Sequence, residues 1–254
     1  MNCGIFIVAR LGSQRLQAKH LQPAASVPVL LHLIRRLRHT FSAQLADGRA
    51  RIVIATSDEP ANRTFEEVVG TEASVFYGSI HNIPLRQLQA AEAVGCSEIV
   101  SVDGDDILCS PTGVLAVAEK LAGGASYAQT SGLPFGINSF GYTRRFLTEA
   151  MAGHQQGTLE TGWGRIFQGK APATISYAHM PQDERLRFTL DYPADLEFFR
   201  ALLEALGPQA PAATDEEIVR LVLDRQFYLH NGALAEEYWA NFRRQLEIEK
   251  KSNS

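Results

Sequence analysis

Long apolar runs, cysteines and an excess of positive charge are all scarce in this sequence of 254 residues. No apolar stretch approaches the roughly 20 residues that a helix needs to cross a bilayer. The opening run Ile5–Val8 is too short for a signal-peptide core and leads directly to Arg10. A net charge of −4 gives no basic field for nucleic acid or an anionic membrane surface. We therefore expect a cytoplasmic protein that binds neither.

Metal-binding and disulfide patterns are missing as well. The seven histidines form no HExxH motif or similar cluster, which argues against a zinc site. The three cysteines have no metal-ligand spacing, and an odd number without a pairing pattern fits a reducing compartment. They are Cys3, Cys96 and Cys109. We expect each of them to be a small buried apolar residue.

Short apolar runs alternate with helical patterns along the first hundred residues. Strands are predicted over residues 5–8, 51–55, 74–77 and 98–102. Helices are predicted between them, over residues 28–38, 65–69 and 85–94. This alternation indicates an α/β sheet with mostly parallel strands. A content of 45% hydrophobic and 20% charged residues is ordinary for a soluble globular protein.

The pattern changes between residues 125 and 185, where glycine and proline interrupt the chain. A strand is predicted over 137–142, and a loop with a short helix over 153–169. Helices return at 196–206, from Asp215, and over 236–251. Because there is no repeat or obvious linker, we expect a single domain, residues 1–254, with 125–185 as a middle excursion.

Three arginines lie on the polar side of the helix that follows Pro28. Val29, Leu33 and Leu37 form its apolar stripe, and proline suits the first turn. The cations opposite that stripe are Arg35, Arg36 and Arg38. We predict that they form a solvated face.

A basic loop follows the first predicted strand. It contains Arg10, Gly12, Ser13, Arg15 and Lys19. Ligands bind α/β sheets just beyond the carboxyl ends of the strands. Three cations with a flexible glycine and a following helix suit a polyphosphate, although the spacing is not that of the GxxxxGK[ST] loop. A basic surface loop without a ligand explains the same residues.

Carboxylates follow the strand that ends at Val102, in the order Asp103-Gly104-Asp105-Asp106. Clustered carboxylates repel one another unless a cation or hydrogen bonds offset the charge. Hard oxygen ligands suit Mg²⁺, which uses one or two protein carboxylates and completes its shell with phosphate and water. A solvated Asp-Gly turn is the structural alternative.

A third strand end is predicted at Leu190, directly before Asp191. Asp195 precedes an apolar helix and is interpreted as a helix cap. Asp191 comes too early to cap that helix, so it is a candidate to hold the same cation as Asp105 from the opposite side.

The segments in this order carry a resemblance to a known family. Ala9–Lys19 resembles the A-R-x-G-S-x-R-L-P-G-K signature of the cytidylyltransferases that activate 3-deoxy-octulosonic and sialic acids. Pro28–Arg38 and Thr189–Glu197 are similar to the P-L-L-E-H-L-I-E-R-L-R and T-V-D-Y-P-E-D-L-E segments of the spore-coat polysaccharide branch. Weaker matches are Ala55–Asp58, Gly78–Ser79 with Arg86, Val102–Asp106 and Glu237–Asn241.

The resemblance implies a Rossmann-like nucleotidyltransferase sandwich that transfers CMP from CTP to an acidic sugar and releases pyrophosphate. It implies that Arg10, Arg15 and Lys19 hold the triphosphate, and that Asp105 and Asp191 bind Mg²⁺. Arg10, Lys19, Asp105 and Asp191 would be the catalytic set. The nucleotide site would comprise Ala9, Arg10, Gly12, Ser13, Arg15, Lys19, Ser79 and Arg86. A homodimer is implied as well, with residues 125–185 serving acceptor binding or dimerisation in bacterial surface polysaccharide synthesis.

Departures from the family pattern fall on other positions. Gln17-Ala18 replaces Pro-Gly, His81-Asn82 replaces two acidic residues, and Glu160–Trp163 replaces E-H-V-T. Since the phosphate and metal positions remain, we predict nucleotidyl transfer to an altered acceptor.

Two other functions fit the same residues. Asp103-Gly104-Asp105 is the D-x-D triplet of a nucleotide-sugar-dependent glycosyltransferase, although the basic loop favours an intact triphosphate. A homologue that binds nucleotide without turnover is the other alternative.

Overall fold

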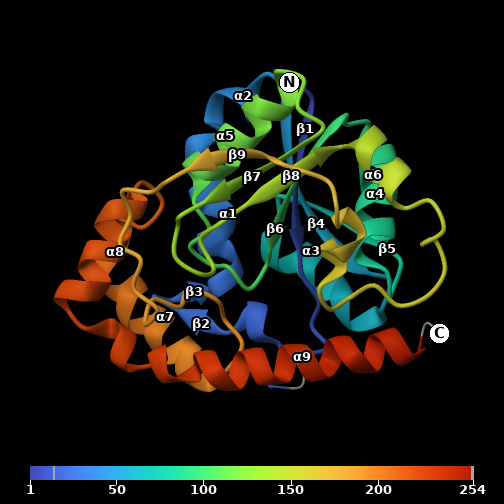
Figure 1. The fold of residues 1–254 in the computed structure, drawn as a ribbon. Coiled ribbons are helices and arrows are strands. Elements are labelled where there is room, and N and C mark those ends of the chain that lie inside the picture. Colours follow the sequence, from blue (N-terminus) through green and yellow to red (C-terminus); the bar gives the residue numbers. More distant parts are fainter. Residues whose placement is uncertain (14, 253–254) are drawn as a thin grey trace.

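A seven-stranded sheet forms the centre of the protein, whose computed structural model describes residues 1–13 and 15–252 (Figure 1). The strands are ordered β5-β4-β1-β6-β8-β7-β9. Their bounds are β1 Cys3–Val8, β4 Ala50–Ser57, β5 Ser74–Gly78, β6 Glu98–Asp103, β7 Tyr127–Ser131, β8 Phe140–Thr143 and β9 Ala173–Ser176. A small separate hairpin pairs β2 Pro23–Ala24 with β3 Val27–Pro28.

The sheet is mostly parallel, as the alternation of strands and helices predicts. β4, β1 and β6 pair in parallel, with β5 beside β4. β8 runs antiparallel to both β6 and β7, and β9 is again parallel to β7. Residues 127–176 therefore supply three strands to the same sheet. Of these three, only β8 coincides with a strand predicted from the sequence.

Helices cover both faces of the sheet (Figure 1). They are α1 Val29–Thr40, α2 Ser42–Ala46, α3 Thr64–Val69, α4 Ile83–Val94, α5 Pro111–Ala122, α6 Arg144–Ala150, α7 Pro193–Leu206, α8 Asp215–Asp224 and α9 Ala235–Ser252. Short 3-10 helices are η1 Lys19–Leu21, η2 Pro60–Arg63, η3 Trp163–Phe167, η4 Gly207–Gln209, η5 Phe227–Leu229 and η6 Gly232–Leu234. In the described part of the chain, no helix has both the length and the apolar character to span a membrane.

Alternation along β1 shows how the sheet is buried on both sides. Ile5 and Ile7 pack in the cluster formed with α1, α3 and α5. Phe6 points to the opposite face and packs with residues of α4 and α6 such as Ala90 and Leu147. Successive side chains of a strand point to opposite faces, so an uninterrupted apolar strand needs a helical layer on each side. A third cluster joins α7 and α8 to residues 186–190.

The predicted solvated face of α1 is wrong for Arg36. Its side chain is fully buried, and its Nη1 donates to the carbonyls of Ala210 (2.8 Å) and Ala213 (2.9 Å). Its Nη2 lies 3.7 Å from a carboxylate oxygen of Asp215. The reason is that α1 packs against residues 210–215 as well as against the sheet. Arg35 is half-exposed and pairs with Glu72 at 2.9 Å.

The strand predicted to end at Leu190 does not belong to the sheet. Residues 186–190 form only an isolated bridge, between Arg187 and Phe135. Leu190 instead donates its backbone N–H to the carbonyl of Asp105 at 2.9 Å. This bond joins two carboxylate-bearing loops directly. Asp195, by contrast, accepts the N–H of Tyr192 at the start of α7 (2.9 Å), which confirms its capping role.

Candidate active site

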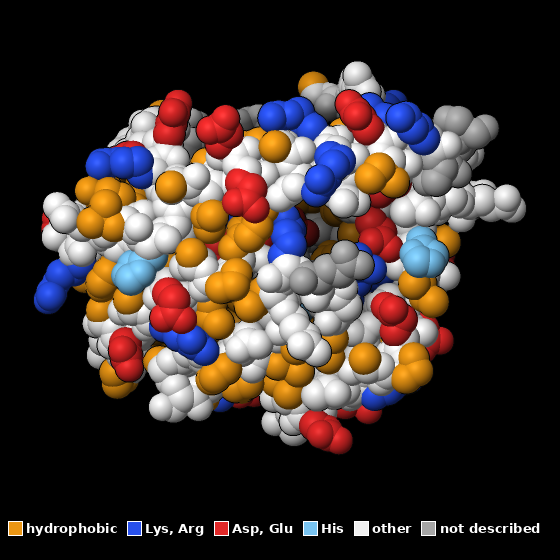
Figure 2. Space-filling model, turned by 90° about the horizontal axis from the view of Figure 1, so that it is seen from below, with side chains coloured by type: hydrophobic (Ala, Val, Ile, Leu, Met, Phe, Trp, Pro, Cys, Tyr) orange, Lys and Arg blue, Asp and Glu red, His pale blue; other side chains and the backbone are white. Residues whose placement is uncertain are grey.

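A cavity of about 890 Å³ lies at the carboxyl ends of β1 and β6, with α9 crossing over this edge of the sheet (Figure 1). Its walls come from residues within 8–13, 15–20, 103–106, 160–164 and 189–192, and from the inner face of α9. Figure 2 shows this side of the molecule, where basic, acidic and hydrophobic side chains gather around a hollow. Ligands of α/β sheets bind at such an edge.

Lys19 joins the two carboxylates that were predicted to share a cation. Its buried Nζ donates to Asp105 and lies 3.4 Å from Asp191 Oδ1. Arg15 Nη2 reaches the same Asp191 oxygen at 2.6 Å. Burial alone would lower the pKa of Lys19, but the Asp105 and Asp191 carboxylates outweigh it and raise that pKa. The basic loop and the two acidic loops therefore form one charged cluster.

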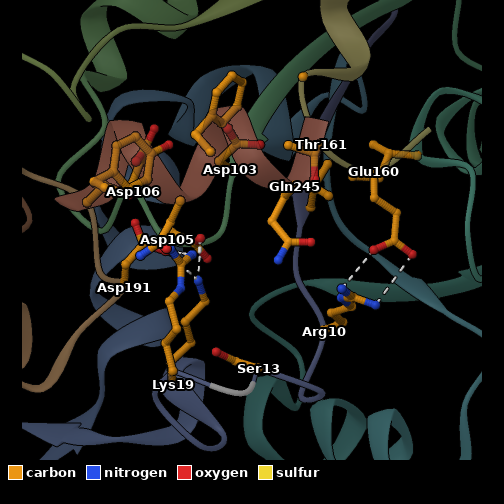
Figure 3. Close-up of a pocket in the computed structure, with 18 of the residues that line it drawn as sticks. Arg10, Ser13, Lys19, Asp103, Asp105, Asp106, Glu160, Thr161, Asp191 and Gln245 are labelled. Carbon is orange, nitrogen blue, oxygen red and sulfur yellow. Dashed lines mark hydrogen bonds and ion pairs between the residues drawn. The ribbon is translucent and has the colours of Figure 1, made fainter. Parts of the chain in front are cut away.

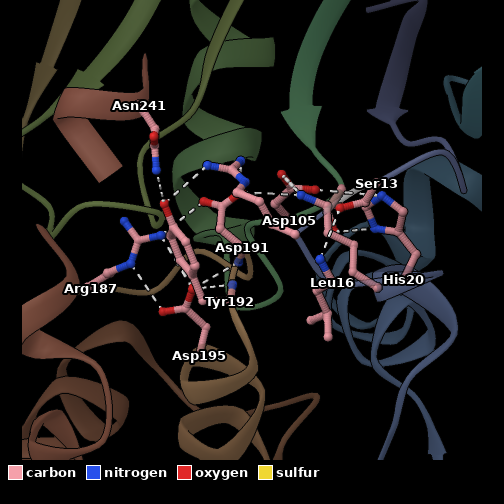
Figure 4. Close-up of polar contacts among 12 residues, drawn as sticks. Ser13, Leu16, His20, Asp105, Arg187, Asp191, Tyr192, Asp195 and Asn241 are labelled. Atoms are coloured by element: carbon pink, nitrogen blue, oxygen red, sulfur yellow. Dashed lines mark hydrogen bonds and ion pairs between the residues drawn. The ribbon is translucent and has the colours of Figure 1, made fainter. Parts of the chain in front are cut away.

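The position of Asp191 is fixed from behind by buried groups (Figure 4). Arg187 Nη2 donates to Asp191 Oδ2 at 2.9 Å, and Arg187 Nε donates to Asp195 at 3.1 Å. Asn231 Nδ2 donates to the same Asp195 oxygen at 2.9 Å. Sequence analysis missed Arg187. A charged residue within the otherwise apolar segment 186–190 was the available signal.

The carboxyl groups on either side of Asp105 have raised pKa values. Asp103 is open to the cavity but enclosed by protein elsewhere, and this burial together with Asp105 raises its pKa to about 6. Burial and the Asp103 charge also raise the pKa of Asp106. Burial lowers the pKa of His20 to about 4, so this ring is neutral. Its Nδ1 donates to the Gly104 carbonyl at 3.2 Å.

The donor set at Asp105 and Asp191 fits Mg²⁺. Both side chains contact the single ammonium of Lys19, so their oxygens flank one cationic position. Among the described residues, no group of three or more His, Cys, Asp or Glu side chains forms a complete metal cage. Two hard carboxylates suit Mg²⁺, because it keeps waters and substrate phosphates in its remaining positions.

Arg10 lies at the other end of the cavity and pairs with Glu160 (Figure 3). Arg10 Nη2 is 2.7 Å from Glu160 Oε2, and His81 Nδ1 is 3.2 Å from Glu160 Oε1. His81, a departure from the family pattern, is therefore in contact with Glu160, although 79 residues separate them. The structure brings Arg15 and Lys19 together but directs Arg10 to this second cluster.

The other predicted nucleotide residues take different places. Ala9, Gly12, Ser13 and Arg86 line the cavity, whereas Ser79 is not among the described residues that do. The Ser79 carbonyl accepts a hydrogen bond from Arg86 Nε at 2.8 Å, and Arg86 Nη2 donates to Ile80 at 2.9 Å. Burial lowers the pKa of Arg86 to about 10. Arg86 thus shapes the loop after β5.

Helix α9 is attached to both walls of the cavity. Asn241 Nδ2 donates to the Tyr192 hydroxyl at 2.8 Å, beside Asp191. Eight residues further on, the buried Glu249 accepts hydrogen bonds from the Thr161 N–H at 2.8 Å and from Arg165 Nη2 at 2.5 Å. Sequence analysis predicted the helix but not these contacts, because the partners lie 49 to 88 residues away.

Comparisons with known proteins relate this chain to cytidylyltransferases. A model of the cytidylyltransferase family matches residues 5–151. The spore coat polysaccharide biosynthesis protein SpsF of Bacillus subtilis is 27% identical over 230 residues, 87% of this chain and 95% of that protein. The 3-deoxy-manno-octulosonate cytidylyltransferase of Serratia proteamaculans is 30% identical over 131 residues, 50% of this chain and 49% of its own length.

A solved structure shares the fold over nearly the whole chain. It is a cytidylyltransferase from Leptospira borgpetersenii, with a TM-score of 0.76 at 18% identity, covering 91% of this chain and 98% of its own. This likeness confirms the α/β nucleotidyltransferase sandwich that the sequence resemblance implies.

Proposed function

The chain belongs to the cytidylyltransferase family, and we propose that it transfers CMP from CTP to an acidic sugar with release of pyrophosphate. The observation that carries this proposal is the contact of Lys19 with both Asp105 and Asp191 at the floor of the cavity. A polyphosphate needs cations, and a metal bound to that polyphosphate needs carboxylates. The floor offers both within one cluster.

The proposed reaction is an in-line displacement at the α-phosphorus of CTP. An acceptor oxygen, the anomeric hydroxyl of a 2-keto-3-deoxy sugar acid, bonds to the α-phosphorus as the bond to the pyrophosphate oxygen breaks, and the hydroxyl proton passes to water. Arg15 and Lys19 bind the β- and γ-phosphates and stabilise the leaving pyrophosphate. Asp105 and Asp191 would hold Mg²⁺, which would supply neutralisation of the negative charge on the triphosphate.

Arg187 and Asp195 serve this reaction by orientation. They hold Asp191 in a buried network. Because its side chain is already fixed, no side-chain rotational entropy has to be lost when the reaction occurs. The N–H groups of Gly12 and Ser13 and the guanidinium of Arg10 complete the triphosphate site. Arg86, with the loop around Ser79, borders the nucleoside. Residues 160–164, within the middle excursion, border the acceptor. Positioning and electrostatics require no nucleophilic side chain.

Pyrophosphate release tests the proposal. We would measure it with CTP, UTP and ATP, with and without Mg²⁺, across a panel of keto-deoxy sugar acids. Release with CTP, Mg²⁺ and one acid supports the transferase and identifies the acceptor. Absence of release across the panel, with CTP still bound, contradicts it and favours a nucleotide-binding homologue without turnover.

A further inference from the structure

The cavity face of α9 presents polar and aromatic side chains. Tyr238, Asn241, Phe242 and Gln245 recur at the spacing of one helix face, and all line the cavity. Tyr238 packs over the Arg187 guanidinium at 4.5 Å, and Asn241 donates to Tyr192. The ring of Phe242 stacks with that of Tyr238. The Gln245 amide makes no hydrogen bond to any residue that the structure describes.

The Gln245 amide points into the space between the two charged clusters. In Figure 3 its side chain leaves α9 and ends between the group of Lys19 and Asp105 and the pair of Arg10 and Glu160. A ligand that extends from one cluster toward the other passes this amide.

The helix is held firmly on both sides of Gln245. One turn before it, Asn241 is bound to Tyr192 at 2.8 Å. One turn after it, the buried Glu249 carboxylate accepts the N–H groups of Glu160 (3.2 Å) and Thr161 (2.8 Å). These anchors fix the backbone at Gln245 relative to both walls. A side chain presented from such a fixed helix gives directional recognition.

The chemistry of the Gln245 side chain favours the acceptor over the nucleotide. Cytidylyltransferases have CTP in common, while the names of two relatives give different sugar acids, 3-deoxy-manno-octulosonate and 8-amino-3,8-dideoxy-manno-octulosonate. The substrate that varies is therefore the acceptor. A neutral amide offers two donors and one acceptor, which match hydroxyl and carbonyl groups better than phosphates.

We propose that Gln245 is a specificity-determining residue that hydrogen-bonds a hydroxyl or carbonyl group of the sugar acceptor. This inference rests on the proposed transfer to an acidic sugar. The charged side chains that can bind the phosphates and the acid group of the substrates lie elsewhere in the cavity. Gln245 therefore selects among acceptors by the neutral groups that they carry.

Kinetics of three variants test the inference. Gln245→Ala is expected to raise the KM for the acceptor about 5- to 10-fold, the loss of one neutral hydrogen bond. The kcat and the KM for CTP should change by no more than about twofold, because the lost hydrogen bond stabilises the bound acceptor equally in the ground state and in the transition state. Gln245→Glu removes the donors and repels an acid, so its acceptor KM should rise further. Glu247→Ala, on the exposed side of α9, is the matched control and should change neither KM.

A direct binding measurement accompanies the kinetics. Calorimetric titration of the acceptor, with a non-hydrolysable CTP analogue present, should show the same loss of affinity for both Gln245 variants. An unchanged acceptor affinity in both variants overturns the inference, as does a rise confined to the KM for CTP. Absence of pyrophosphate release by the native protein instead contradicts the transferase proposal, and the inference about Gln245 then falls with it.

Discussion

At the Lys19 end of the cavity the central charges, Lys19 and Asp191, are buried and shared with further partners, whereas at the Arg10 end the ion pair with Glu160 is partly open to solvent. Asp191 is 3% exposed and contacts Arg15, Lys19 and Arg187. The Arg10 side chain is 43% exposed and pairs with Glu160. Buried ionic networks are costly to disrupt one partner at a time, while exposed pairs contribute little to stability. The Lys19 end therefore holds its charged groups in fixed positions, whereas the Arg10–Glu160 pair can be broken at little cost in stability.

The largest effect should come from removing Asp191. Asp191→Ala takes away a proposed metal ligand and one of the two carboxylates that Arg187 contacts, so turnover should fall by several orders of magnitude. Pyrophosphate release under saturating substrates measures the loss. Asp191→Asn keeps the side-chain volume and shows whether charge is decisive. Asp183→Ala, which breaks only the surface pair with Arg185, is the control. Normal turnover by Asp191→Ala would refute the metal assignment.

Lys19→Met should have the next largest effect. Without the ammonium, Asp105 and Asp191 lose the cation that they share, and only Asp191 keeps arginine partners, so the variant should melt at a lower temperature than the native protein. We also expect the KM for CTP to rise about 100-fold, from the loss of one buried charged contact. Addition of Mg²⁺ should raise the melting temperature of Lys19→Met more than that of the native protein. An identical Mg²⁺ response in both proteins would argue against a cation site between these carboxylates.

Changes at the open end should separate binding from stability. Arg10→Ala is expected to raise the KM for CTP about 10-fold, while the free energy of unfolding changes by less than about 1 kcal/mol. Glu160→Gln frees Arg10 and should leave stability similarly unaffected. Denaturant unfolding and initial-rate kinetics measure the two quantities. A loss of several kcal/mol in either variant would show that the Arg10 end resembles the Lys19 end after all.

The smallest effect concerns the pH dependence of stability without Mg²⁺. The pKa of Asp103 is about 6 in the folded protein and near 3.8 when unfolded. Between these values the folded state binds more protons, so stability decreases as pH rises through this window. Asp103→Asn removes this contribution and should flatten the decrease between pH 4 and 6. Thermal melting at several pH values measures it, and equal slopes in both proteins would contradict the raised pKa.

Local sequence patterns predicted the central strands of the sheet and several of the charged residues at their ends. The strands at 5–8, 51–55 and 98–102 follow from short apolar runs, and Lys19, Asp105 and Asp191 from the polar residues that come after such runs. Arg36, Glu160 and Glu249 could not be placed in this way. Their roles depend on partners at least 79 residues away, and periodicity carries no information about such pairs. The Leu190 segment was predicted as a sheet strand because an apolar run gives no indication of its hydrogen-bonding partner.

The hydrogen bond from the Leu190 N–H to the Asp105 carbonyl has a consequence for how such an enzyme diversifies. Since main-chain atoms join the two loops, the distance between the two loop backbones does not depend on either side chain. The backbone at the proposed metal site is thus insulated from substitutions elsewhere in the cavity. Point substitutions in α9 or in residues 160–164 could retune the choice of acceptor without disturbing that spacing, which makes this architecture a tractable starting point for directed evolution.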